Sequence, residues 1–328
     1  MWSCWPREMD SSRFARNEWT TFGAVEVVMP MVDVFIVGAP KCGTTALFKY
    51  LGEHPSIFTP DFVRGNTGKT EANHFAREFQ REDDPMRDRA YYLSFFQSAR
   101  EDQLACDASV YHLYSPSAAN EIFKYNPEAR IIVMLRKPSA FMFSYYQEMR
   151  FHGLESCADF SEALRREDER ADTRLRYRHL ARYSEHLKKY LDVFPRDKVL
   201  LIQFEDFFDD PKAGYKRVVD FLNVPEWYPA TFTRVNPSKK ARYQALHQVI
   251  YHPPRRIVAS IKRLIGEQRA VWLAHRLVLL SRSFNTTRAR SSMSAELEAA
   301  LDAEFEPEVA RLENLTGLDL RGWKPTKG

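Results

Sequence analysis

Three short apolar runs constrain the fold of this chain more than any other feature. They cover residues 33–37, 130–135 and 198–204, and each is nearly continuous in apolar residues and bounded by polar or glycine residues. Runs of this kind are typical of strands buried on both faces of a sheet. Residues 104–108 form a weaker fourth candidate. We therefore expect a sheet at the centre of the molecule.

Amphipathic helices are predicted between these strands. Apolar side chains recur at helical spacing after the first run, after the second and before the third, at Ala46, Leu47, Tyr50 and Leu51, at Phe141, Met142, Tyr145, Tyr146 and Met149, and at Tyr183, Leu187, Tyr190, Leu191 and Phe194. Strands that alternate with such helices favour an α/β fold with a mostly parallel sheet flanked by helices. The 328 residues are enough for one domain with a large core. We expect it over residues 32–328, after an N-terminal extension over 1–31, with a helical C-terminal lid over about 230–295.

Composition excludes several classes of protein. The chain has 48 basic and 44 acidic residues, a net charge of +4, which is too small a surplus to indicate nucleic-acid binding. Its four cysteines are widely spaced and lack a zinc-binding pattern, so free thiols, a cytoplasmic location and no metal are expected. No apolar stretch is long enough for a transmembrane helix.

Three segments stand apart from the α/β pattern, and one of them, residues 61–85, is polar, carries Gly65 and Gly68 and is predicted to form a long loop. Residues 1–21 lack the apolar region of a signal peptide, and Met29 or Met31 is a plausible start of the protein. Residues 251–290 are basic and amphipathic, which favours a helical flap with a solvated basic face over a contact with a membrane surface or an acidic glycan.

The residues that follow the first predicted strand have the features of an anion-binding loop. Gly38-Ala39-Pro40-Lys41-Cys42-Gly43-Thr44-Thr45 lies between a strand and a helix. That placement directs backbone N–H groups and the positive helix end at one point. A nucleotide-triphosphatase loop has its lysine directly after the second glycine, where Thr44 stands here. A P-loop kinase or NTPase is therefore disfavoured, although it remains an alternative.

This P-loop-like segment resembles the 5′-phosphosulfate-binding loop of sulfotransferases that use 3′-phosphoadenosine 5′-phosphosulfate (PAPS). The resemblance rests on P-K-C-G-T-T-A-L and extends over roughly residues 33–323. It implies that Lys41 contacts the bridging oxygen of the donor. It also implies that Gly43, Thr44 and Thr45 hold the phosphate and sulfuryl oxygens, and that Cys42 contributes mainly its backbone amide.

A second part of the resemblance concerns the 3′-phosphate of the donor. The family has an arginine at the end of a buried strand and a serine eight residues later in a helix, which match Arg136 and Ser144. A guanidinium offers phosphate a planar fork of donors. In the basic segment 236–242, Lys239 and Arg242 match a loop that closes over the nucleotide in related bacterial members. A solvated basic turn is the alternative for that segment.

The base that removes the acceptor proton is expected in the segment Lys69-Thr70-Glu71-Ala72-Asn73-His74-Phe75. It resembles the K-E-x-x-x-F segment of carbohydrate-type members, which assigns the base to Glu71. The family lysine directly before the glutamate is Thr70 here, and Lys69 lies one residue further back. His74 is the rival base because an imidazole titrates near neutrality. Packing in the core is the alternative for His74.

The resemblance implies sulfuryl transfer to a hydroxyl or amine of an acceptor. A saccharide or another small metabolite is expected, with Phe58, Phe62, Tyr111 and Tyr114 as candidates to line its cleft. A binding module that has lost its catalytic activity is a second alternative, which the altered Lys69-Thr70-Glu71 segment favours. In-line transfer of this kind depends mainly on positioning and on positive charge at the leaving oxygen.

Overall fold

The computed structural model describes residues 30–61, 71–232 and 292–325, the backbone of residues 239–241 and 286–288, and scattered positions between 260 and 276. The chain divides into two compact units. The larger one holds residues 29–146, 159–237 and 292–328, and the smaller one holds residues 1–28, 147–158 and 238–291. Most of the predicted extension over 1–31 and of the predicted lid lies outside the described residues, so these domain boundaries stay predictions.

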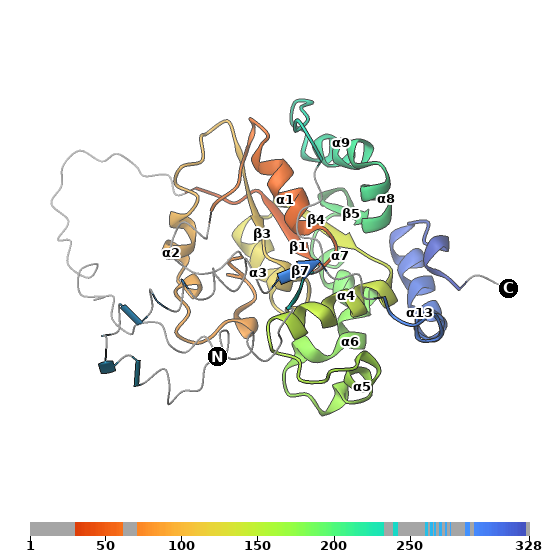
Figure 1. Ribbon diagram of the computed structural model, residues 1–328. Helices are drawn as coiled ribbons and strands as arrows, with labels where there is room; N and C mark the ends of the chain where they lie inside the picture. Colours follow the sequence, from red (N-terminus) through yellow and green to blue (C-terminus); the bar gives the residue numbers. More distant parts are fainter. Residues whose placement is uncertain are drawn as a thin grey trace, which may run out of the picture. The chain divides into compact units, whose positions relative to one another are not determined.

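The larger unit is built on a five-stranded sheet in which every pair of neighbouring strands is parallel (Figure 1). The strand order is β2-β3-β1-β4-β5. The strands are β1 (Val34–Gly38), β2 (Ile57–Phe58), β3 (Leu104–Ala108), β4 (Arg130–Leu135) and β5 (Val199–Gln203). All four predicted strands are confirmed. The two-residue edge strand β2 was not predicted, because it is too short to show a pattern.

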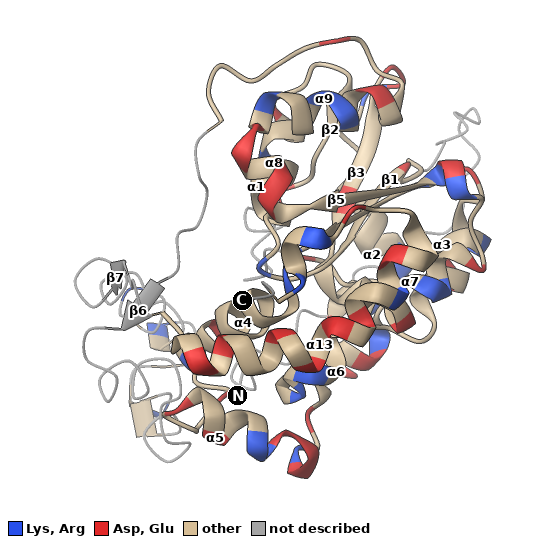
Figure 2. Ribbon diagram, turned by 90° about the vertical axis from the view of Figure 1, so that its right-hand side faces the viewer, with Lys and Arg blue, Asp and Glu red and all other residues tan. Residues whose placement is uncertain are grey.

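Helices cover both faces of this sheet. In Figure 2, α1, α8 and α9 lie on one face, and α3, α7 and α13 lie on the other. The α-helices named in the described residues are α1 (Thr44–Gly52), α2 (Arg89–Ser94), α3 (Ala118–Tyr125), α4 (Pro138–Phe151), α5 (Phe160–Arg165), α6 (Tyr177–Ala181), α7 (Tyr183–Leu191), α8 (Phe204–Asp209), α9 (Pro211–Leu222) and α13 (Ala295–Thr316). The predicted α/β class and a C-terminal helix are confirmed.

The core lies between the sheet and these two helix layers. All five residues of β1 are buried, because β1 is central in the sheet and helices cover both of its faces. On one side, Tyr50 of α1 packs edge to face against Tyr215 of α9, with ring centroids 6.4 Å apart. Burial of a large apolar side chain contributes about 1.5–3 kcal/mol, so this contact holds the last turn of α1 against α9.

Helix α13 caps the start of α7 from a distance in sequence. The buried Glu308 carboxylate accepts hydrogen bonds from the Ser184 N–H (2.7 Å) and the Ser184 hydroxyl (2.9 Å), and it pairs with Arg311 (2.9 Å). The first N–H groups of a helix have no partner within the helix, and a carboxylate satisfies them while favouring the positive helix end. This contact holds α13 against α7.

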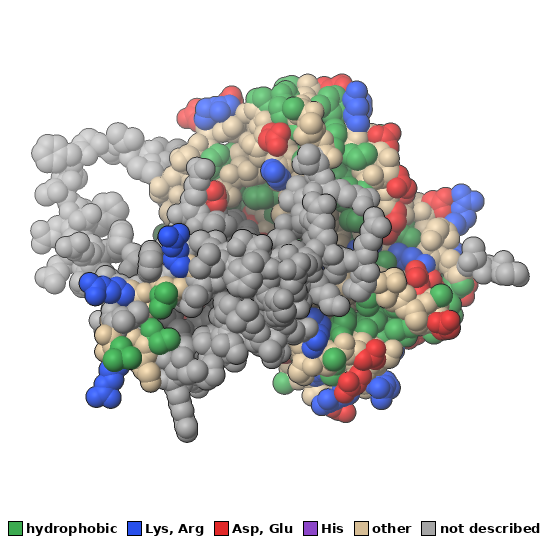
Figure 3. All heavy atoms as spheres, viewed as in Figure 1, with side chains coloured by type: hydrophobic (Ala, Val, Ile, Leu, Met, Phe, Trp, Pro, Cys, Tyr) green, Lys and Arg blue, Asp and Glu red, His purple; other side chains and the backbone are tan. Residues whose placement is uncertain are grey.

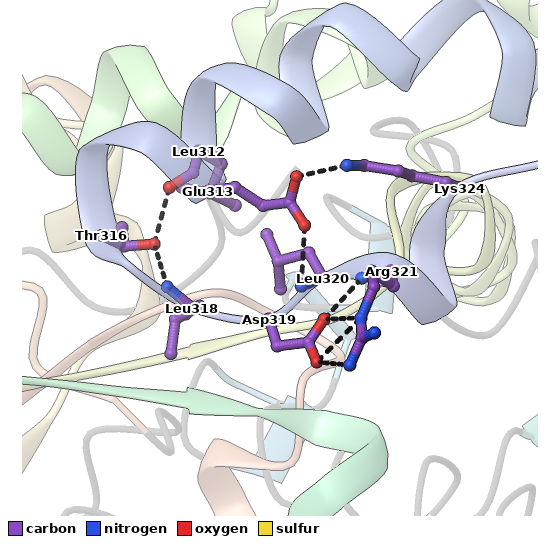
Figure 4. A network of polar contacts seen from close by, with 8 residues as sticks. All are labelled: Leu312, Glu313, Thr316, Leu318, Asp319, Leu320, Arg321 and Lys324. Atoms are coloured by element: carbon purple, nitrogen blue, oxygen red, sulfur yellow. Dashed lines mark hydrogen bonds and ion pairs between the residues drawn. The ribbon is translucent and has the colours of Figure 1, made fainter.

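The end of α13 turns the chain back onto the unit, as Figure 4 shows. Gly317 takes the left-handed conformation that glycine adopts freely at a helix end (φ 72°). The Thr316 hydroxyl donates to the Leu312 carbonyl (2.6 Å), and the Glu313 carboxylate accepts from the Leu320 N–H (3.1 Å) and pairs with Lys324. The turn leads into the short 3₁₀ helix η8 (Arg321–Trp323) and buries Trp323.

On the described part of the face drawn in Figure 3, basic and acidic side chains occur side by side. Cys42, Cys106 and Cys157 are buried free thiols. Among the residues that the structure describes, no helix combines the length and apolar character needed to cross a membrane. In the smaller unit, β6 (Lys239–Ala241) and β7 (Thr286–Arg288) form an antiparallel pair that was not predicted.

Candidate active site

The predicted anion-binding loop connects the end of β1 to the start of α1. It is held to the neighbouring strand, because the Ala39 N–H donates to the Met134 carbonyl of β4 (2.7 Å). Lys41 (φ 62°) and Gly43 (φ 89°) both have left-handed backbone, which curls the loop around its N–H groups. Helix α1 has neither an acidic residue in its first turn nor a side-chain cap. Its positive end is therefore suited to an external anion.

Glycine at position 43 is required by its surroundings as well as by its backbone. A Cβ atom added there would lie 2.5 Å from Cε2 of Phe208 in α8. Around it, Cys42 and Thr44 are buried, Lys41 is half-buried and Thr45 is exposed. Burial raises the pKa of the Cys42 thiol, so this side chain stays neutral. The Cys42 N–H donates to the Ala39 carbonyl (3.3 Å) and closes the loop.

Arg136 follows β4 directly, at the strand end next to this loop. Its guanidinium lies over the ring of Phe204, 4.5 Å from the centroid, which holds it in a fixed orientation. The Arg136 Nε atom is buried and has no hydrogen-bond partner among the described residues. A buried donor without a partner is costly, and a bound anion would supply the missing acceptor.

The backbone next to Arg136 is fixed by the C-terminal part of the unit. Glu205 accepts from the Lys137 N–H (3.3 Å) and from the Trp323 indole N–H (3.2 Å). Asp302 of α13 pairs with Lys137 (2.6 Å) and accepts from the Ser139 hydroxyl (2.6 Å). The Glu205 carboxylate is thus engaged by two N–H donors.

The other residues expected to bind the donor are placed unequally. Ser144 lies within α4 and is buried, in the helix that starts just after Arg136. Lys239 lies in β6 of the smaller unit, and Arg242 lies outside the described residues. Their contact with the nucleotide stays a prediction.

Glu71 lies next to the end of β3, the strand beside β1. Its Oε2 atom accepts from the Val110 N–H at 3.4 Å, and its side chain is half-buried. Lys69 and Thr70 lie outside the described residues, so whether Lys69 replaces the family lysine stays open to test. The sheet thus gathers the glutamate, the loop and Arg136 at the carboxyl ends of three neighbouring strands, where open α/β sheets bind ligands.

His74 has the surroundings of a core residue. It is buried, its Nδ1 atom lies 2.6 Å from the Met86 carbonyl, and its ring stacks on Tyr92 with centroids 4.4 Å apart. Desolvation lowers the pKa of His74. These contacts favour the packing alternative over the role of base.

Sequence reasoning missed a buried polar network beneath the Glu71 segment. Asp107 accepts from the Tyr92 hydroxyl (2.9 Å) and the Ser109 hydroxyl (2.8 Å), and the Ser109 oxygen accepts from the Asn73 N–H (2.9 Å). Desolvation by burial raises the pKa of Asp107 to about 6, against the lowering effect of these two donors. No spacing in the sequence signals this network, because Tyr92, Asp107 and Asn73 meet only in the fold.

The aromatic residues expected in the acceptor cleft are also placed. Tyr111 stacks on Phe79 with centroids 5.0 Å apart, and its hydroxyl lies 3.0 Å from that of Tyr145. Tyr114 is buried, Phe58 packs against Phe96 in an edge contact, and Phe62 lies outside the described residues. Tyr111 directly follows Val110, whose N–H donates to Glu71. That any of the four residues lines an acceptor cleft stays a prediction.

Comparisons with known proteins identify the family of the chain. A family model described as the sulfotransferase family matches residues 33–229. A solved sulfotransferase from Alicyclobacillus acidocaldarius is 28% identical with a TM-score of 0.65, covering 90% of this chain and 99% of that one.

Curated relatives match over part of their length. The bifunctional heparan sulfate N-deacetylase/N-sulfotransferase 1 of Caenorhabditis briggsae is 26% identical over 63% of this chain and 24% of its own. The heparan sulfate glucosamine 3-O-sulfotransferase 6 of Homo sapiens is 26% identical over 58% of this chain and 52% of its own. The chain thus spans between about a quarter and a half of these relatives. With the family model matched over more than half of its residues, the chain belongs to the sulfotransferase family.

Proposed function

We propose that this sulfotransferase moves a sulfuryl group from PAPS to a hydroxyl or amine of a saccharide or another small metabolite. The observation that carries the proposal is a pair of anion-ready groups at neighbouring strand ends. One is the loop before α1, and the other is Arg136 with its buried, unpartnered Nε atom. A nucleotide with phosphate groups at both its 5′ and 3′ positions needs two such sites.

The fit of the donor to these residues is chemical. The N–H groups of Gly43, Thr44 and Thr45, at the positive start of α1, would hold the 5′-phosphosulfate. Arg136 would hold the 3′-phosphate through charge-assisted hydrogen bonds, with Ser144 as a neutral donor. Binding of Lys239 and Arg242 to the nucleotide belongs to the same proposal.

The reaction then needs one bond to form and one to break. A lone pair of the acceptor oxygen or nitrogen attacks sulfur, while the bond from sulfur to the 5′-phosphate oxygen breaks and its electrons stay on the leaving nucleotide. Lys41 stabilises the negative charge that develops on that oxygen. Glu71 takes up the proton that the attacking hydroxyl or amine loses, so the sulfated product carries no extra positive charge.

We assign the base to Glu71 rather than to His74 on geometric grounds. The Glu71 carboxylate is half-buried and held at the end of β3 by the Val110 N–H. His74 instead turns its Nδ1 atom to a backbone carbonyl inside the core. A group that exchanges protons with an acceptor must reach it, and the surroundings of Glu71 allow this more readily.

The saccharide acceptor is proposed from the curated relatives, whose names refer to heparan sulfate. The stacked pair of Tyr111 and Phe79 supports it, because aromatic faces offer apolar contact area to a sugar ring. A cytoplasmic location and the absence of a metal stay predictions from the sequence.

Calorimetric titration with 3′-phosphoadenosine 5′-phosphate, the desulfated donor, in EDTA tests the donor class. We expect binding without a metal, and Arg136→Ala should lose about 2–3 kcal/mol, or about 30- to 160-fold in affinity, from its charged hydrogen bonds. Arg321→Ala, at an exposed arginine, serves as the control and should bind normally. No binding, or equal binding of ATP with magnesium, would return the P-loop kinase to first place.

A second experiment tests the base. Glu71→Gln should bind the desulfated donor normally and lose at least about 100-fold in turnover, because the amide cannot take up the proton. Unchanged turnover would remove Glu71 from the mechanism. Complete absence of turnover in the unmodified protein with every acceptor offered would favour a binding module.

A further inference from the structure

We propose that Asp107 and Ser109 are positioning residues that fix the segment 71–76, so that the Glu71 carboxylate stays at the Val110 N–H. This inference rests on the proposed role of Glu71 as the base. It assigns a purpose to a buried acid and a buried hydroxyl that the proposed chemistry does not otherwise use.

The pair acts through one continuous set of hydrogen bonds. Asp107 is the second-last residue of strand β3 and accepts from the Ser109 hydroxyl. The Ser109 oxygen in turn accepts from the Asn73 N–H. Asp107 and Ser109 are both fully buried. Because the hydroxyl has a single hydrogen and gives it to the carboxylate, its lone pairs are directed away from Asp107 and toward the backbone amide.

The anchored amide belongs to a residue that governs the path of the segment. Asn73 has left-handed backbone (φ 50°) and closes a turn, since its carbonyl accepts from the Ala76 N–H (3.0 Å). It lies two residues after Glu71. Nearby, the His112 Nε2 atom accepts from the Phe75 N–H (3.3 Å), and the Gln80 side chain donates to the Ala72 carbonyl (2.9 Å). The backbone on the C-terminal side of Glu71 is thus held at Ala72, Asn73 and Phe75.

The same short segment also holds the carboxylate of Glu71 itself. Val110, whose N–H donates to Glu71, is the residue directly after Ser109. Residues 109 and 110 therefore bind the segment twice, once through the Asn73 backbone and once through the Glu71 side chain. The spacing between these two contacts sets where the carboxylate lies at the end of β3.

Asp107 is itself held in one orientation. Its second oxygen accepts from the Tyr92 hydroxyl (2.9 Å), and Tyr92 is a buried residue of α2. Each carboxylate oxygen thus has one hydroxyl donor, which fixes the plane of the group and so the direction of the Ser109 hydroxyl. Displacing a catalytic group by about 1 Å can lower the reaction rate about 100-fold. Loss of this support should therefore be measurable as a lower kcat.

Ser109→Ala tests the proposal, with Ser115→Ala as a matched control. Ser115 is equally buried, and its hydroxyl also accepts from backbone N–H groups, those of Ser117 and Ala118. Among the described residues, its hydroxyl has no hydrogen bond to residues 71–76. Both variants remove one buried hydroxyl acceptor. Turnover is measured with PAPS and desulfated heparan sulfate oligosaccharides, and binding is measured with the desulfated donor.

We expect Ser109→Ala to lower kcat about 10- to 100-fold with donor affinity within about twofold of normal, because Lys41 and Arg136 are not touched. Ser115→Ala should leave kcat within about twofold. Hydrogen exchange of the Asn73 amide should also become faster in Ser109→Ala alone. If Ser109→Ala does not fold, the isosteric Tyr92→Phe carries the test and should lower kcat with normal donor binding.

The outcomes separate the two proposals. If Glu71→Gln abolishes turnover but Ser109→Ala behaves like Ser115→Ala in kcat and in exchange, the positioning role is wrong and the base stands. If Glu71→Gln turns over normally, the base assignment fails, and the positioning proposal that rests on it falls as well. A loss of donor affinity equal to the loss in kcat in Ser109→Ala would indicate general disruption and would also overturn the proposal.

Discussion

Replacing Asp107 by asparagine should change how the stability of the fold depends on pH. Asp107 is fully buried, and desolvation raises its pKa from 3.8 to about 6 even though two hydroxyls donate to it. A carboxyl group whose pKa is higher in the folded than in the unfolded state favours folding while it is protonated in both states. That contribution is lost as the pH rises through the folded pKa.

The size of the effect follows from the shift. About two pKa units at 1.36 kcal/mol each correspond to about 3 kcal/mol of unfolding free energy, lost between about pH 4 and pH 6 and constant above that. Asparagine does not ionise, so the variant lacks this dependence. The neutral amide also changes the hydrogen bonds to Tyr92 and Ser109 by an amount that does not depend on pH, and only the slope is interpreted.

Urea unfolding followed by tryptophan fluorescence, from pH 4.5 to pH 7.5, measures this slope. The unfolding free energy of the unmodified protein minus that of Asp107→Asn should fall by about 2 kcal/mol between pH 4.5 and pH 6 and then level off. Asp209→Asn, at an exposed aspartate, shows how much of any change comes from the substitution type alone. A flat difference, or one that rises with pH, would refute the argument from burial.

Two further substitutions test the framework around the site. Gly43→Ala should destabilise the fold by at least about 1–2 kcal/mol and weaken binding of the desulfated donor, because the backbone is left-handed and Phe208 occupies the space of a Cβ atom. Chemical unfolding measures the stability and calorimetry measures the binding. Normal values in both would contradict this prediction. Glu308→Ala should cost about 2–4 kcal/mol by leaving the start of α7 uncapped, as measured by urea unfolding, and the exposed Glu306→Ala should cost little. Equal losses in these two glutamate variants would show that the cap contributes nothing.

The strands and the anion-binding loop were predictable because their signals are local. Residues 131–135 are all apolar, and Gly38 to Thr45 occupy consecutive positions, so the apolar pattern and the spacing were enough. Strand β3 gave a weaker signal because its buried face includes Asp107. Burial of an ionisable group runs against the hydrophobic pattern from which strands are predicted.

The supports of the site were not predictable, because they join distant parts of the chain. Trp323 meets Glu205 and Asn73 meets Ser109 only after the sheet has formed, and no spacing in the sequence encodes either contact. His74 shows the reverse difficulty. Its unperturbed titration near neutrality made it a candidate base, whereas burial against Met86 and Tyr92 decides its state in the fold.

The bond between Trp323 and Glu205 has a consequence for synthesis of the protein. The loop that carries Arg136 is synthesised well before Trp323, whose indole completes the support of that loop through Glu205. A nascent chain that stops before Trp323 lacks the hydrogen bond from the indole to Glu205. Ligand binding stabilises only the state that it recognises, so the nucleotide should protect a chain that includes Trp323 from proteolysis far better than a chain that stops before it.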